Sequence, residues 1–169
     1  MGQSPDGSTY NDRGDGVPLI NGPTEFGPDP LSKTRTIQFT NAPTKMCKAN
    51  DVILCVRGST TGRMNIAGCD ACIGRGVAAI RSENTSYIAW ALSAMQDSIH
   101  SLAAQTGSTF PNITQSTLSA IEIPLPPKEI QEIIVQGLTE EQKLVEANKK
   151  LIALFEAKIK GRISSVWET

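Results

Sequence analysis

Residues 138–167 read LTEEQKLVEANKKLIALFEAKIKGRISSVW, and apolar side chains recur along them at intervals of seven residues. This seam and the residues that widen it are Leu138, Leu144, Val145, Leu151, Ile152, Phe155, Ile159, Ile163 and Val166. A heptad repeat of this length favours the pairing of one helix with another. Helix formers dominate from Glu129 to Trp167, and at about 1.5 Å per residue this helix would reach nearly 60 Å. A small domain does not need such a helix to cover its own core, so we expect the helix to pair with a partner.

Four residues complicate this helix. Gly137 costs about 1 kcal/mol relative to alanine in a helix interior. Thr139 and Gln142 have the spacing of a capping box and can start a new helix there. Asn148 either fixes the register of the pairing as a buried polar residue or lies at the edge of the apolar stripe without effect.

The first eighty residues are typical of short strands joined by turns. Residues 17–20 form a brief strand among glycines and prolines, and residues 34–40 alternate with a period of two. The apolar run 51–57 (DVILCVR) predicts a buried strand. Residues 71–80 (ACIGRGVAAI) predict another, whose glycines allow a bulge or a close backbone approach.

A helical period follows over residues 85–105, where apolar side chains recur every three or four positions. Asn84 or Ser86 can cap its start. Residues 106–117 read as a polar loop, and residues 120–125 as a last strand that ends in prolines. We therefore predict an α+β fold, in which short strands and one or two helices form a compact domain (1–126) and a long coiled-coil helix follows (127–169).

Composition places the 169-residue chain among globular proteins, with 39% hydrophobic and 20% charged residues. No apolar run approaches the roughly 20 residues that span a bilayer. The first sixteen residues lack the basic start and apolar centre of a signal peptide, so we expect a cytoplasmic protein with reduced cysteines and no membrane partner.

The net charge of −1 is unevenly distributed. Residues 1–32 carry five acids against one base, whereas residues 33–81 carry eight bases against two acids. Such asymmetry is compatible with a basic face on a balanced protein, or with bases scattered over a solvated surface.

Motifs for catalysis and for metal binding are weak. Cys69 and Cys72 have zinc-knuckle spacing, but Cys47 and Cys55 are eight residues apart and do not form a second such pair. No thioredoxin-like pattern surrounds the cysteines, and the sole histidine, His100, lies within the predicted helix. The motifs of nucleotide-binding loops, of hydrolases and of adenine methyltransferases are absent, as is a nuclease-like carboxylate cluster. We expect no enzyme activity, no resident metal and no cofactor.

One loop has the chemistry of DNA recognition. The segment 57–65 (RGSTTGRMN) follows a buried strand, and loops on rigid strands often carry binding residues. Arginine pairs with guanine edges and asparagine with adenine edges, while serine and threonine reach phosphates. An ordinary hairpin turn is the alternative interpretation.

Seven pieces in order resemble the specificity subunits of type I restriction–modification systems and the related recognition modules of fused methylases. They are MGQSP (1–5), LINGPTEFG (19–27), DVILCVRGSTTGRMNIA (51–67), CIGRGVAAI (72–80), GSTFPNIT (107–114), IEIPLPPKEIQEIIV (121–135) and LVEANKKLIALFEAKIKGRISSVW (144–167). The resemblance implies a globular part that reads one half of a split site in double-stranded DNA. It also implies a long helix that pairs antiparallel with its counterpart and docks on methyltransferase subunits.

The resemblance further implies that the partner methyltransferase uses S-adenosylmethionine to methylate adenine, and that a translocating subunit performs restriction. A complete specificity subunit carries two recognition domains and two long helices, whereas this chain has one of each. Two copies in a homodimer would rebuild the whole. Position 128 is Lys, where the family more often has Leu.

The residues expected near DNA come from four segments. They are Lys33, Arg35, Arg57, Ser59, Thr60, Arg63, Asn65 and Arg75, with Thr106, Ser108, Thr109 and Asn112 in a second loop. Two other interpretations remain: a coiled-coil assembly or decoy module of the same complex that binds no DNA, and a recognition fragment of a fused methylase.

Overall fold

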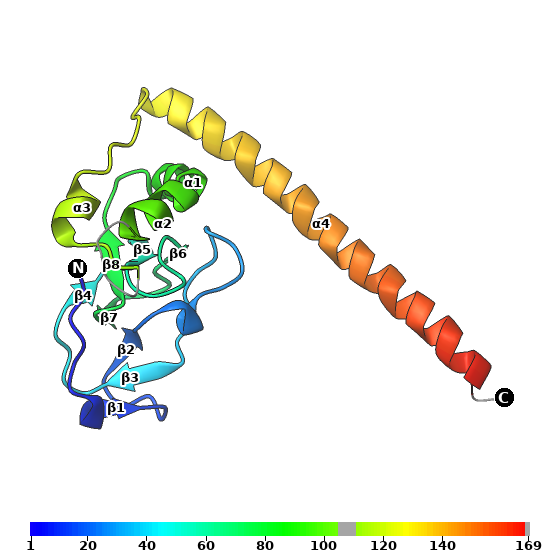
Figure 1. The fold of residues 1–169 in the computed structure, drawn as a ribbon, viewed down its shortest axis with the longest axis horizontal. Coiled ribbons are helices and arrows are strands. Elements are labelled where there is room, and N and C mark those ends of the chain that lie inside the picture. The colour runs from blue at the N-terminus through cyan, green and yellow to red at the C-terminus, as the bar shows by residue number, and fades with distance from the viewer. Residues whose placement is uncertain (105–110, 168–169) are drawn as a thin grey trace. The chain divides into compact units, whose positions relative to one another are not determined.

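The computed structural model describes residues 1–104 and 111–167 of the chain. It divides into two compact units, Met1–Leu125, here called the globular unit, and Pro126–Thr169, here called the helical unit. Figure 1 shows short strands and helices in the first unit and one long helix in the second. The predicted class, an α+β domain followed by a long helix, is confirmed.

Two sheets form the centre of the globular unit. Among the described residues, the larger sheet has the strand order β1-β3-β2-β7-β4, and the smaller has the order β6-β5-β8. The larger sheet consists of β1 (Tyr10–Asn11), β2 (Val17–Ile20), β3 (Gln38–Thr40), β4 (Met46–Cys47) and β7 (Ala71–Ile73). The smaller consists of β5 (Val52–Cys55), β6 (Met64–Ile66) and β8 (Val77–Ile80). Only the pairing of β2 with β7 is parallel among these described pairs.

The core of the globular unit lies between these sheets. It unites Ile20 and Ile73 from the larger sheet with Ile53, Cys55 and Val77 from the smaller one. Every residue of β5 is buried, as the apolar run 51–57 predicts. The run 71–80 belongs to both sheets, because the turn at residues 74–76 passes the chain from β7 to β8.

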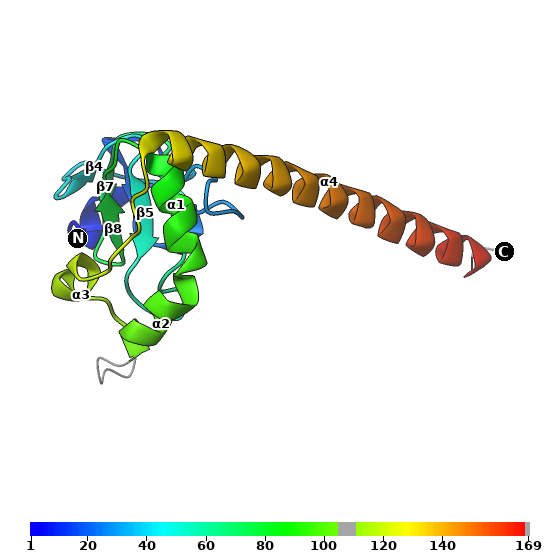
Figure 2. The ribbon, with the colours of Figure 1, turned by 90° about the horizontal axis from the view of Figure 1, so that it is seen from above.

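Helices α1 (Thr85–Ala94) and α2 (Gln96–Ala104) replace the single predicted helix over 85–105. Asn84 caps α1, since its side chain accepts a hydrogen bond from the Tyr87 N–H, as the sequence allows. Figure 2 shows α1 beside β5 and α2 continuing beyond it. The interruption at Met95, whose backbone leaves the helical region, accompanies the packing of α2 against Gly62.

Three other predictions of secondary structure are wrong. The strand predicted over 34–40 is present only as β3, because Arg35 pairs instead with Glu25. The predicted loop 106–117 contains α3 (Gln115–Ser119), which Thr114 caps. Residues 120–125 form no strand; the prolines there lack N–H donors, and the Pro124 carbonyl accepts a hydrogen bond from Tyr87 Oη, 2.7 Å away.

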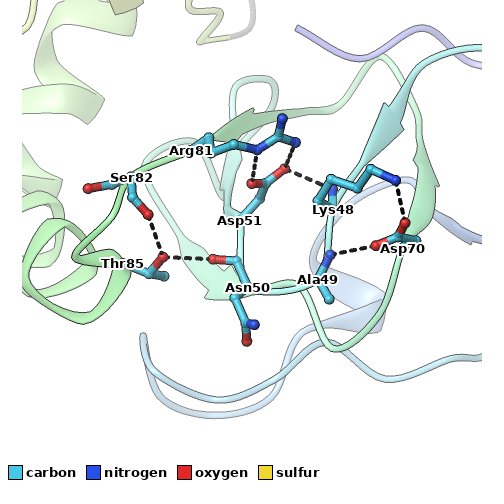
Figure 3. A network of polar contacts seen from close by, with 8 residues as sticks. All are labelled: Lys48, Ala49, Asn50, Asp51, Asp70, Arg81, Ser82 and Thr85. Atoms are coloured by element: carbon cyan, nitrogen blue, oxygen red, sulfur yellow. Dashed lines mark hydrogen bonds and ion pairs between the residues drawn. The ribbon is translucent and has the colours of Figure 1, made fainter.

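A network of polar contacts fixes the start of β5 (Figure 3). The buried carboxylate of Asp51 accepts two hydrogen bonds of 2.8 Å from Arg81 and one from the Lys48 N–H. Asp70 accepts from Lys48 Nζ at 2.7 Å and from the Ala49 N–H. Burial opposes ionisation of Asp51, but the bonds from Arg81 and Lys48 outweigh it and hold its pKa below the ordinary value. Two of the eight bases in residues 33–81 therefore neutralise nearby acids.

The helical unit is dominated by α4 (Lys128–Trp167), which is uninterrupted. The capping box suggested by Thr139 does not break it; the Thr139 hydroxyl instead donates to the Val135 carbonyl, one turn earlier, at 2.6 Å. Every residue of α4 whose side chain is described is exposed or half-buried. Within the described residues, no helix combines the length and apolar character that crossing a membrane requires.

Candidate nucleic-acid interface

The loop predicted to bind DNA is the connection between β5 and β6. Its backbone folds back on itself, with the Gly62 N–H donating to the Cys55 carbonyl at 2.9 Å and the Thr61 N–H to the Gly58 carbonyl at 3.1 Å. Gly58 and Gly62 have φ angles of 82° and 90°, which glycine adopts readily and other residues rarely. Ser59 at the tip of the loop is exposed, and Thr60 is half-buried.

The second predicted loop meets the first one at its described end. The Gly58 N–H donates to the Pro111 carbonyl at 2.9 Å, and the Ile113 N–H donates to the Val56 carbonyl at 2.8 Å. An isolated antiparallel bridge joins Arg57 to Asn112. The structure thus brings Asn112 beside Arg57, whereas Thr106, Ser108 and Thr109 lie outside the described residues.

The turn between β7 and β8 carries Arg75 to the same place. The Val56 N–H donates to the Gly76 carbonyl at 2.9 Å, which continues the pairing of β5 with β8 toward this turn. A Cβ atom at Gly76 would collide with the Asn21 backbone carbonyl, and one at Gly74 with the Asn21 side chain. Gly76 is therefore required by close packing against backbone, whereas a larger residue at Gly74 would have to displace the Asn21 side chain.

The first residues of the chain form a further wall beside this turn. The Gly2 N–H donates to the Val77 carbonyl and the Gln3 N–H to the Ile73 carbonyl, both at 2.9 Å. Ser4 Oγ accepts a hydrogen bond from the Arg75 N–H at 3.0 Å. The segment predicted only as loop thus holds the Arg75 turn in place.

Together these segments enclose an open concavity of about 520 Å³, here called the arginine cleft. Its lining residues are Ser4, Pro5, Gly7, Tyr10, Asn21, Arg57, Arg75 and Gly76. Both arginines are exposed, and none of these lining residues has a carboxylate. Asp6 follows Pro5 but does not line the cleft; hydrogen bonds from the Ser8 hydroxyl and N–H lower the pKa of its carboxylate. The lining residues thus carry two positive charges and no negative one, which suits an anionic or polar ligand.

Two predicted contact residues have structural roles instead. Asn65 is fully buried, and its amide donates to the Asp29 carbonyl at 2.7 Å and accepts from the Gly27 N–H. Arg63 is half-buried; its guanidinium donates to the Gly27 carbonyl at 3.1 Å and lies 6.0 Å from the centre of the Phe26 ring. A contact between Asn65 and DNA would require this packing to open, so we leave Asn65 out of the interface.

Lys33 and Arg35 do not line the arginine cleft. Lys33 lines a separate hollow of about 350 Å³ together with Asn84 and Thr85 at the start of α1. Arg35 is exposed but donates to the Thr24 and Phe26 carbonyls at 3.0 and 3.4 Å. The structure therefore distributes the predicted basic residues over more than one surface.

The cleft is also lined by Ser4, Tyr10 and Asn21, which were not predicted. No local sequence pattern could reveal these contacts, because Ser4 and Arg75 are 71 residues apart in sequence. The glycines around Arg75 were a partial clue, since their packing against Asn21 closes one side of the cleft.

The cysteines have the properties of core residues. Cys47, Cys55 and Cys72 are buried and Cys69 is half-buried. Burial raises the pKa of Cys47 above its ordinary value and that of Cys55 to about 11, which disfavours the thiolate that binds metals. Within residues 1–104 and 111–167, no three His, Cys, Asp or Glu side chains are grouped to hold a metal ion.

Known proteins share both the sequence and the fold of this chain. Residues 5–157 match the family model described as the type I restriction modification DNA specificity domain. A protein from Methanocaldococcus jannaschii, named as the specificity subunit of the type I restriction enzyme MjaX, is 38% identical over 157 residues. That match covers 89% of this chain and 35% of the relative.

Two solved structures agree with this match. A chain from a study of complex assembly and conformational transition of the type I R-M system has a TM-score of 0.80 at 34% identity, covering 95% of this chain and 39% of that chain. The HsdS subunit from Thermoanaerobacter tengcongensis has a TM-score of 0.75 at 33% identity, covering 89% of this chain and 36% of that chain. The chain thus spans a little over a third of the length of these relatives.

These findings confirm the resemblance that the sequence pieces indicate. Specificity subunits of this family are non-catalytic and bind no cofactor themselves. The chain belongs to the type I restriction modification DNA specificity domain family.

Proposed function

We propose that the globular unit binds double-stranded DNA and reads one half of a bipartite site, through a surface centred on the arginine cleft. In this role the chain directs adenine methylation by modification subunits that bind S-adenosylmethionine, and restriction by a translocase subunit. The observation that carries the proposal is that Arg57 and Arg75, from two different loops, line one hollow, while residues 111–113 pair with the loop that carries Arg57.

The chemistry of this surface supports DNA as the ligand. Arg57 and Arg75 supply positive charge for phosphates or guanine edges, and Ser59 and Thr60 add short hydroxyl donors on the same loop. The loops are held by backbone hydrogen bonds to buried strands, so their side chains are presented from a rigid base. Lys33 and Arg35 remain candidates for contacts at the margin.

A salt series tests DNA binding by this chain. A labelled duplex is titrated with the protein, and the logarithm of the association constant is expected to fall linearly with the logarithm of salt concentration. Arg57→Ala should weaken binding, whereas Lys150→Ala, which removes one charge from α4, should not. A chain without salt-dependent affinity would contradict the proposal and favour the assembly or decoy module.

We also propose that α4 pairs with a second copy of α4 and docks on modification subunits. The support is the exposure of its heptad seam: Leu144, Ile159 and Ile163 are 65%, 63% and 59% exposed. Contiguous apolar surface of this kind marks an interaction site. The other seam residues are exposed or half-buried.

The charges along α4 favour an antiparallel pair. Residues 128–147 carry five acids and two bases, whereas residues 148–167 carry one acid and five bases. These charges extend well beyond the terminal turns on which the helix dipole acts. In an antiparallel pair the acidic half of one helix lies along the basic half of the other, and in a parallel pair like charges meet.

Sedimentation equilibrium tests the pairing of this chain. The expected mass is that of two copies, and Ile152→Lys should reduce it to one because a charge is then placed in the apolar seam. Ala153→Lys, next to it but outside the seam, is the matched control, because it adds the same charge to the half of the helix that is already basic. Co-purification with a modification subunit tests docking separately, so that a monomer which still docks would contradict only the homodimer.

A further inference from the structure

The two arginines of the cleft are carried by neighbouring segments. The antiparallel register of β5 and β8 pairs Cys55 with Val77, and the hydrogen bond from the Val56 N–H to the Gly76 carbonyl continues that pairing. Beyond it, Arg75 lies in the turn that the bond from the Val77 N–H to the Gly74 carbonyl closes, and Arg57 is bridged to Asn112. Both arginines line the arginine cleft.

This placement is unfavourable for the free protein. Two like charges that line one hollow repel each other when no anion lies between them. Among the described residues, no hydrogen bond or ion pair joins either guanidinium to a carboxylate, in contrast to Lys48 and Arg81 in the same unit. An anion held between the two guanidinium groups would replace their repulsion with two attractions.

We propose that the arginine cleft binds one backbone phosphate of DNA between Arg57 and Arg75, with Ser4 as the positioning residue for Arg75. This assignment rests on the proposed DNA binding and names the ligand group that the cleft takes. A phosphodiester is a compact anion with two unbridged oxygens, and arginine recognises such oxygens with paired N–H donors.

The other polar side chains of the cleft already form hydrogen bonds within the protein, so they are not available to read a base. Asn21 Nδ2 already donates to Gln38 Oε1 at 3.1 Å, and the Asn21 side chain packs on Gly74. The Tyr10 hydroxyl is directed to the Pro5 carbonyl at 3.3 Å. Reading a base requires a fixed set of donors and acceptors, whereas the groups that remain here are two cations, which recognise charge.

Ser4 acts on the cleft through Arg75. Its hydroxyl oxygen accepts from the Arg75 N–H, and the segment that carries it is itself fixed by the bonds of Gly2 and Gln3 to residues 73 and 77. The contact orients the backbone of the turn and leaves the Arg75 guanidinium exposed for the ligand.

The stability of the free protein gives a first test, which needs no DNA. Arg57→Ala or Arg75→Ala should raise the melting temperature of the globular unit by about 1–4 °C, because either substitution removes the repulsion. The double variant should be little more stable than either single one. A fall in melting temperature in both single variants would overturn the clamp.

Salt-dependent binding to two unrelated duplexes gives the second test. The double variant should bind both duplexes more weakly by the same factor, about tenfold or more, and its salt slope should fall by about 1, the contribution of one phosphate. Lys150→Ala should leave the slope unchanged. Loss of discrimination at one base position would overturn the proposal in favour of base reading, and a fall in slope of about 2 would overturn a shared phosphate.

A double-mutant cycle tests the role of Ser4. Ser4→Ala should weaken binding to both duplexes, and this effect should vanish when Arg75 is already alanine. Ser164→Ala, on α4 and outside both the cleft and the apolar seam, should bind normally. An effect of Ser4→Ala that persists in Arg75→Ala would overturn positioning through Arg75. If the wild-type chain binds the duplexes and both arginine substitutions leave binding unchanged, the clamp and the cleft-centred surface fail, while DNA binding by the chain itself stands.

Discussion

The globular unit and α4 place the same kinds of side chain in opposite environments. Ile53 in β5 is 0% exposed, whereas Ile152 in α4 is 57% exposed. The globular unit therefore has its own core between two sheets, and the apolar seam of α4 remains available for another surface. The stability of most helices in proteins comes from packing of the apolar face. The globular unit is thus organised to fold around its own core, whereas α4 is organised to associate with another surface.

The largest effect is expected from a matched pair of isoleucine substitutions. Ile53→Ala should lower the free energy of unfolding of the globular unit by about 2–5 kcal/mol, because it leaves a cavity in a packed core. Ile152→Ala should leave that unfolding unchanged and weaken self-association instead. Chemical denaturation followed by the fluorescence of Trp90, which lies in the globular unit, checks the first result, and sedimentation checks the second. Equal destabilisation of the globular unit by both changes would contradict the comparison.

A matched pair of carboxylate substitutions should have smaller effects. Asp51→Asn should lower the free energy of unfolding by about 1–3 kcal/mol, because a buried acceptor of three hydrogen bonds is weakened. Glu146→Gln, which breaks the ion pair with Lys149 on α4, should change helix stability by about 0–1 kcal/mol. Chemical denaturation and circular dichroism measure the two values. If the two substitutions lower the free energy of unfolding by similar amounts, burial of Asp51 does not strengthen its hydrogen bonds.

The pH dependence of stability gives a further test of the stabilising role of the Asp51 carboxylate. The pKa of Asp51 is lower in the folded protein than its ordinary value of 3.8, so its stabilising effect is complete above that value. The effect is lost as the pH falls through the lower pKa of the folded state. Asp51→Asn should therefore flatten the acid limb of the stability curve, although Asp6 and Asp70, whose pKa values are also lowered, keep part of it. An acid limb identical to that of the wild type would contradict the role of Asp51.

A pair of glycine substitutions should have effects of opposite sign. Gly76→Ala should destabilise the globular unit, because the new Cβ meets the Asn21 carbonyl. The Cβ that Gly137→Ala adds would meet no atom within 4 Å, so this substitution should stabilise α4 by up to about 1 kcal/mol. Thermal unfolding followed by circular dichroism measures both changes. Destabilisation by Gly137→Ala would indicate that α4 needs a close approach at this position.

The features predicted correctly from the sequence are those with a local physical signature. The heptad seam predicted α4, the apolar run 51–57 predicted β5, and Asn84 was recognised as a helix cap. Each depends on residues close together in the sequence, where periodicity and capping chemistry act.

The errors arise where distant segments compete for the same backbone. Arg35 has the alternation of a strand residue, but its N–H donates to the Glu25 carbonyl, so β3 begins only at Gln38. Asn65 has the chemistry of a DNA contact, but the loop at Gly27 buries it. The structure brings Arg57 and Arg75 of the predicted set to one cleft, and Ser4 and Asn21 join them there through contacts that no local pattern reveals.

The central claim is that each globular unit reads DNA and that α4 joins two copies in antiparallel orientation. Co-expression of the chain with a cognate modification subunit, followed by mapping of methylated adenines, tests it most directly. The account predicts methylation within a split palindrome whose two half-sites are the same sequence in inverted orientation. Methylation of an unsplit or asymmetric sequence, or methylation that does not depend on this chain, would contradict it.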